Sequence, residues 1–161
     1  EPLRVGHHRT MVDGRDVIVL VSGHLTVAAK SIVDKLQAEH PGLGLINVAT
    51  LKPFDDEVLI QKLAEARVVI TIENHWVASG LARIVAGALM ARQSRAQLIT
   101  VGVGDTFTHG GTGAYLEDFY GIGERHIRGA IAKALGVSGE ARDGSTGGGA
   151  IGLTEGVAEG L

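Results

Sequence analysis

DVIVLV, at residues 16–21, is a nearly continuous run of β-branched side chains, and it decides the fold class. Runs of this kind are typical of strands buried on both faces, as in parallel sheets. Residues 22–24 (Ser-Gly-His) interrupt the run, and apolar residues then recur at the spacing of one helix face as far as Leu36. The stretch therefore predicts a buried strand followed by an amphipathic helix.

The same unit repeats along the chain. Helical spacing is seen around Leu59, from about Leu81 to Arg92, and again up to Leu135, and a short helix is expected at residues 115–120. Strands are expected at residues 43–48, 68–72 and 97–101. Alternating strands and helices predict an α/β fold, a three-layer α/β/α sandwich around a mostly parallel sheet of about five strands. One of these strands can run antiparallel.

Composition divides the 161 residues into three parts. Residues 1–15 are polar and mixed, include the pair His7-His8, and are expected to be a linker or arm. Residues 16–136 hold the strand–helix repeats. Residues 137–161 are rich in glycine and poor in large apolar side chains, which predicts a flexible tail. The chain begins with Glu1 and not Met, so we also expect a fragment or a processed chain.

Charge and residue usage exclude several classes of function. The net charge of −3 and the 4 % aromatic content favour neither nucleic acid nor an anionic membrane as a partner. No cysteine is present, which excludes disulfides and thiolate chemistry and is compatible with a cytoplasmic protein.

Four predicted loops follow strands, at residues 22–24, 50–53, 73–75 and 104–106. Because the carboxyl ends of parallel strands share one edge of a sheet, these loops are expected to meet there. Such an edge can bind a small molecule or an anion. It can also simply cap helices and pack against a partner, which is the interpretation that we favour.

Candidate chemistry within these loops is sparse. Glu73 and His75 can form an acid/base pair, but Glu73 can equally accept backbone amides and order the turn, which we favour. The histidine spacings match no zinc motif, and His7-His8 is an exposed pair at most. A phosphate-binding P-loop is also missing, and Phe107 breaks the G-x-G-x-x-G pattern after Gly102.

Several motifs, in order, resemble those of transketolase C-terminal domains. LKPFD (residues 51–55) resembles the family's (I/L)-K-P-(L/F)-D block, and VVITIENH (residues 68–75) resembles V-V-T-V-E-x-H. Gly80-Leu81 stands where the family opens a helix, and VGVGDTF (residues 101–107) resembles (I/V)-G-x-x-D-x-F. The strand at residues 16–23 and the sequence YGI (residues 120–122) fit the same family, particularly its split, archaeal-style versions.

The resemblance implies a role within a thiamine-diphosphate-dependent enzyme. The diphosphate and its magnesium ion are held in this family by a G-D-G…N motif in another domain, and this chain has Gly104-Asp105-Thr106 instead. No catalytic, cofactor-binding or metal residue is therefore expected here. Family-motif and possible interface residues are Lys52, Pro53, Asp55, Glu73, His75, Trp76, Gly80, Asp105, Phe107 and His109.

The resemblance also implies partners. We expect the chain to contact the remaining transketolase domains or subunit and to form a homodimer contact. In the full enzyme, sugar phosphates are also expected. Trp76, expected in a loop, and Phe107 and His109 are plausible anchors of such a contact. Two alternatives stay open: the equivalent domain of a 1-deoxyxylulose-5-phosphate synthase or a 2-oxo-acid dehydrogenase beta chain, and a stand-alone small-molecule-binding module.

Overall fold

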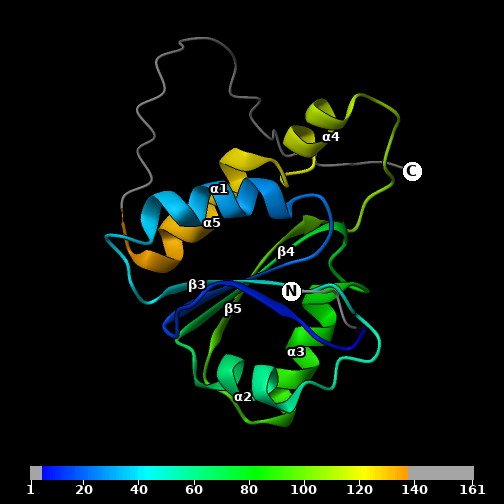
Figure 1. Cartoon of the computed structure of the whole chain (residues 1–161). Helices are drawn as coiled ribbons and strands as arrows, with labels where there is room; N and C mark the ends of the chain where they lie inside the picture. Colours follow the sequence, from blue (N-terminus) through cyan, green and yellow to red (C-terminus); the bar gives the residue numbers. More distant parts are fainter. Residues whose placement is uncertain (1–4, 138–161) are drawn as a thin grey trace, which may run out of the picture.

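The computed structural model describes residues 5–137 and shows a five-stranded sheet between two layers of helices (Figure 1). The strands are β1 (Arg9–Val12), β2 (Val17–Val21), β3 (Leu43–Asn47), β4 (Val68–Trp76) and β5 (Gln97–Val103). Their order in the sheet is β1-β3-β2-β4-β5. Strand β2 pairs in parallel with β3 and with β4, and β4 pairs in parallel with β5. The predicted three-layer, mostly parallel architecture is confirmed.

The helices divide between the two faces of the sheet. They are α1 (Thr26–Leu36), α2 (Glu57–Glu65), α3 (Leu81–Ala91), α4 (Gly113–Phe119) and α5 (Glu124–Leu135). In Figure 1, α1 and α5 lie over one face, and α2 and α3 lie over the other. Among residues 5–137, none of the helices is both long enough and apolar enough to cross a lipid bilayer.

Strand β2 supplies side chains to two separate apolar cores. Because successive side chains point to opposite faces of a sheet, Val17, Val19 and Val21 pack with α1 and α5. Ile18 and Leu20 pack with α2 and α3. All five side chains are fully buried, as the unbroken apolar run at residues 17–21 predicts for a central strand.

Strand β1 corrects the expected boundary at residue 16. It lies inside the segment expected to be a linker or arm and pairs antiparallel with β3. Its four residues are exposed or half-buried at the edge of the sheet, so they have no apolar run for a sequence pattern to detect. The flexible tail expected at residues 137–161 lies outside the described residues, apart from Val137.

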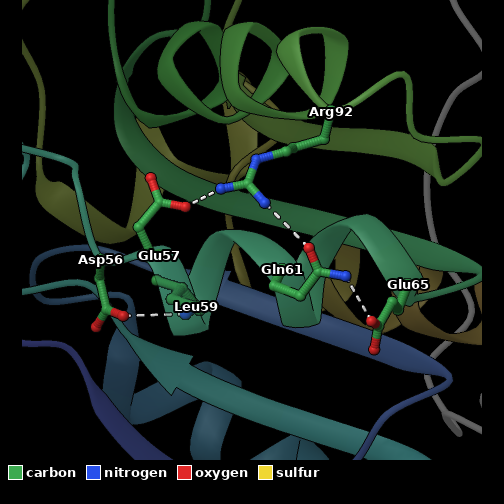
Figure 2. Close-up of polar contacts among 6 residues, drawn as sticks. All are labelled: Asp56, Glu57, Leu59, Gln61, Glu65 and Arg92. Carbon is green, nitrogen blue, oxygen red and sulfur yellow. Dashed lines mark hydrogen bonds and ion pairs between the residues drawn. The ribbon is translucent and has the colours of Figure 1, made fainter.

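Side-chain contacts at the start of α2 fix its position beside α3 (Figure 2). Asp56 accepts the backbone N–H of Leu59 at 3.0 Å and so caps the helix, within the acidic cluster that the sequence places there. Arg92, at the end of α3, donates to the Glu57 carboxylate and to Gln61 Oε1. These polar contacts join the two helices of one layer at their solvent side.

Candidate functional site

The carboxyl ends of β4 and β5 pair irregularly. The two strands are in register from Val68 to Ile72, but the next partners are Trp76 and Val103. Glu73, Asn74 and His75 thus occupy an irregularity inside β4, not a loop after it, and Trp76 is the last residue of the strand. The prediction of a loop at these residues is wrong. Their polar side chains end the apolar pattern in the sequence, but the backbone continues as a strand and pairs with β5 again at Trp76.

A glycine in β5 permits this irregular pairing. A Cβ at Gly102 would lie 2.6 Å from Val77 Cγ1 and 3.1 Å from the His75 carbonyl oxygen. Both distances are shorter than ordinary van der Waals contact, so only the smallest residue allows the backbone of residues 75–77 to come this close.

Glu73 is buried and orders the start of α3. Its two carboxylate oxygens accept the backbone N–H groups of Leu81 and Ala82 at 2.7 and 2.8 Å. The first amides of a helix have no partner within the helix, and a carboxylate there also interacts favourably with the helix dipole. The acceptor role expected for Glu73 is observed, although it acts from a strand on a helix eight residues ahead.

Gly80 leaves the space that the Glu73 carboxylate needs. A Cβ at residue 80 would overlap Glu73 Oε2. Gly80 is also the residue before α3, where the chain is buried between the strand and the helix. Glu73 and Gly80 therefore form one structural unit.

A cleft of about 420 Å³ opens beside this unit, between the ends of β4 and β5. Its lining residues share mostly polar or small side chains: Asn74, His75, Trp76, Val103, Gly104, Asp105, Thr106 and Thr108. His75 Nε2 lies 3.4 Å from Ser79 Oγ at its rim. Since neither Lys nor Arg lines the cleft among the described residues, it is poorly suited to a phosphate. The amide, hydroxyl and carboxylate groups of the cleft are instead suited to hydrogen bonds with a neutral polar surface.

Only two of the four predicted loops meet in this cleft. Asn74 and His75 of one loop and residues 104–106 of the other line it, whereas His24 turns to α4 and donates from Nε2 to Glu117 Oε1 at 2.8 Å. In the remaining loop, Thr50 Oγ1 accepts the Gly6 amide. Lys52 and Pro53, which are joined by a cis peptide bond, are exposed. Asp55 is exposed as well.

An aromatic cluster surrounds His109, and sequence reasoning missed it. The His109 N–H donates to the Tyr120 hydroxyl at 2.9 Å, and that hydroxyl lies 2.7 Å from His109 Nδ1. The rings of Tyr115 and Phe119 also contact the imidazole. Tyr115 and Phe119 are four residues apart on α4, which is a signal for a shared face, and Tyr120 is the residue that follows the helix. Phe107 stands apart, with its side chain completely exposed.

His8 differs from the exposed position that its sequence suggests. Its ring packs 5.2 Å from the ring of Phe54, and within residues 5–137 neither ring nitrogen has a hydrogen-bond partner. Burial lowers the pKa of His8 from its usual 6.5, against the smaller raising effect of Asp56. At the amino end of β2, a two-point hydrogen bond from Arg67 lowers the pKa of Asp16.

The described residues offer no cluster for a metal ion: no group of three His, Cys, Asp or Glu side chains is suitably placed in residues 5–137. Magnesium prefers several oxygen ligands held in octahedral geometry.

Known proteins show where this architecture occurs. A solved structure described as a split gene transketolase, an inactive beta4 tetramer, is 30 % identical with a TM-score of 0.72, and the match covers 84 % of this chain and 44 % of that one. An uncharacterized transketolase family protein of Sinorhizobium fredii is 32 % identical over 81 % of this chain and 39 % of its own length. A 1-deoxy-D-xylulose-5-phosphate synthase of Dictyoglomus turgidum is 27 % identical over 84 % of this chain and 22 % of its own.

The chain thus spans less than half the length of these relatives. The family model for the transketolase C-terminal domain matches residues 6–127, which include all five strands and the aromatic cluster. On that match, the chain belongs to the transketolase C-terminal domain family.

Proposed function

We propose that this chain is the C-terminal section of a thiamine-diphosphate-dependent transketolase, which transfers a two-carbon ketol unit between sugar phosphates. The single observation that supports this best is the likeness to a split gene transketolase over 84 % of the chain at 30 % identity. The match from residue 6 to residue 127 supports the same role.

We place the cofactor chemistry in the remaining domains. When bound by those domains, thiamine diphosphate would supply the electron sink for breaking and forming the carbon–carbon bond. The residues of this chain support that division because its cleft lacks Lys and Arg, and residues 5–137 lack a group of three metal ligands. The chain's own contribution is structural: Glu73 and Gly80 hold β4 and α3 together.

The remaining transketolase domains or subunit would cover the carboxyl end of the sheet. Trp76 is 42 % exposed there and Phe107 is fully exposed, while Tyr115 and Phe119 are at least half exposed. Exposed aromatic side chains mark contact surfaces, because they gain most when a partner removes them from water. The absence of cysteine from this chain is compatible with a cytoplasmic location.

Two other assignments compete with this one. The relative from Dictyoglomus turgidum supports the equivalent domain of a 1-deoxyxylulose-5-phosphate synthase, at lower identity than the transketolase relative. The 420 Å³ cleft supports a small-molecule-binding module. No contact within residues 5–137 specifically favours the 2-oxo-acid dehydrogenase beta chain.

Two measurements test the proposal. The full enzyme is assayed for ketol transfer from a ketose phosphate to an aldose phosphate, and in parallel for formation of 1-deoxy-D-xylulose 5-phosphate. Isothermal titration calorimetry then measures thiamine diphosphate with magnesium binding to the 161-residue chain alone. We expect ketol transfer by the enzyme and no binding by the chain. Synthase activity, or cofactor binding by the chain in the micromolar range, would contradict the proposal.

A further inference from the structure

The cleft at the ends of β4 and β5 holds hydrogen-bonding side chains that the rest of the described chain does not use. Asn74, Asp105, Thr106 and Thr108 all line it, and within residues 5–137 none of these four side chains forms a hydrogen bond. Together they offer carboxylate, amide and hydroxyl oxygens to anything that enters a space of about 420 Å³. This volume lies within the range of small-ligand sites.

The negative charge at this cleft is not balanced by a cation of the described chain. Asp105 is exposed and forms no ion pair within residues 5–137, and neither Lys nor Arg is among the lining residues. A second carboxylate is buried close by: a Cβ at Gly102 would lie 3.2 Å from Glu73 Cγ. Both oxygens of Glu73 bind amides of α3, so it adds charge but no free acceptor. The neutral groups of the cleft do not select a charge, whereas these carboxylates favour a cation.

Trp76 adds an aromatic wall to the same cleft. It is the last residue of β4, is 42 % exposed, and pairs with Val103, two residues before Asp105. Among the described residues its ring packs against no other aromatic ring. The face of an indole attracts cations more strongly than the face of any other side chain. The strand pairing therefore holds an indole beside a carboxylate, at the ends of two rigid elements.

We propose that this cleft is a binding site for a guanidinium group, which stacks on Trp76 and donates two N–H groups to the Asp105 carboxylate. A guanidinium is planar, carries five N–H donors in a fixed fork, and stacks on aromatic faces. The oxygens of Asn74, Thr106 and Thr108 accept N–H groups that the carboxylate does not take. An ammonium group is a compact, strongly hydrated point charge and cannot stack and pair in this way. The guanidinium belongs either to a free small molecule or to an arginine side chain of the remaining section, and the tests below separate these sources.

Intrinsic fluorescence tests the site directly, because Trp76 is the one tryptophan of the 161 residues. The chain is titrated with L-arginine amide at low salt and about pH 8, where imidazole groups are mostly neutral. L-Citrulline amide has nearly the same shape without the charge, and L-lysine amide presents an ammonium group. We expect a saturable change in emission with L-arginine amide, and a dissociation constant at least about tenfold higher for both controls, since neither can form the charged, two-point pair.

A matched pair of variants tests the role of the carboxylate. Asp105→Asn keeps the size of the side chain and removes its charge, so it should raise the dissociation constant of L-arginine amide at least about tenfold. Asp55→Asn removes the same charge from an exposed residue outside the cleft and should leave binding unchanged. Circular dichroism checks that both variants are folded. Backbone amide NMR of the wild type locates the ligand without any substitution, and we expect shifts at residues 74–76 and 103–108.

Calorimetry on the assembled enzyme separates the two sources of the guanidinium. If an arginine side chain of the remaining section fills the cleft, Asp105→Asn weakens assembly and L-arginine amide no longer binds there. If the ligand is a free small molecule, assembly is unaffected by Asp105→Asn and L-arginine amide still binds. Both results support the site.

Three results would overturn the inference: no saturable response of the isolated chain, an equal response to L-arginine amide and L-citrulline amide, or binding that Asp105→Asn leaves unchanged. None of these measurements uses ketol transfer. Their failure would leave the proposed enzyme role intact, and a full enzyme without ketol transfer would leave the guanidinium site intact.

Discussion

The carboxylate of Glu73 lies 2.7 Å from the backbone nitrogen of Leu81 and accepts its N–H group. Its other oxygen accepts the N–H of Ala82 at 2.8 Å. A single buried side chain therefore joins the irregular end of β4 to the first turn of α3. This geometry uses both oxygens in structural contacts and leads to the first prediction.

Replacing Glu73 by Gln should lower the free energy of unfolding of the chain. The amide keeps the shape but presents an NH₂ group, which cannot accept a hydrogen bond, to one of the two backbone amides. We expect a loss of about 1.5–3 kcal/mol, the scale for hydrogen bonds to charged groups. Urea denaturation followed by circular dichroism measures it. In the full enzyme, a hundredfold loss of turnover with unchanged stability would instead indicate general-base catalysis.

Replacing Gly80 by Ala should disturb the same contact from the other side. The added Cβ overlaps Glu73 Oε2, so the carboxylate must move away from α3. Gly80→Ala and Glu73→Gln should each destabilise the chain, and together they should cost clearly less than the sum of the two losses. A double-mutant cycle measures this coupling. Gly87→Ala, on α3 with no atoms near its Cβ position, is the control and should be neutral or stabilising.

Lowering the pH below neutrality should destabilise the chain through His8. Its folded-state pKa lies below the ordinary value of 6.5, so the unfolded chain binds a proton more readily in that interval. The stability due to the neutral, packed ring is complete above about pH 6.5 and is lost as the pH falls towards the folded-state pKa. Between about pH 7.5 and about pH 5, we expect the melting temperature of His8→Leu to fall less than that of the wild type. His40→Leu removes another histidine and should behave as the wild type.

Phe107→Ala should leave the melting temperature of the isolated chain unchanged, because its side chain is fully exposed and buries nothing within the described residues. The same variant should weaken association with the remaining section of the enzyme, measured by calorimetry or co-purification. Met90→Ala, also strongly exposed but on α3, is the control and should affect neither property. Unchanged association of Phe107→Ala would remove Phe107 from the proposed contact surface.

Trp76→Ala should behave differently from Phe107→Ala. More than half of the Trp76 surface is covered by this chain, so the variant should lower the stability of the isolated chain as well as its association. Differential scanning calorimetry of the chain and light scattering of the assembly separate the two effects. A destabilised chain with normal association would make Trp76 only a packing residue of the sheet end.

Local sequence pattern determined the architecture and the family of this protein. The apolar runs at residues 17–21 and 68–72 identify central strands, because a strand buried on both faces needs apolar side chains at every position. The helical stripes between them place helices on both faces. The ordered motifs from residue 51 to residue 122 are sufficient to indicate the transketolase C-terminal domain.

Only the tertiary structure decided the edges and the site. Strand β1 and residues 73–76 of β4 owe their conformation to backbone hydrogen bonds with strands distant in sequence, and such bonds leave no pattern in side-chain hydrophobicity. The partners of Glu73, the pairing of His109 with Tyr120 and the lining of the cleft depend in the same way on long-range register. The local periodicity of the sequence indicates which side chains are buried, whereas the pairing of backbone groups is fixed only when the chain has folded.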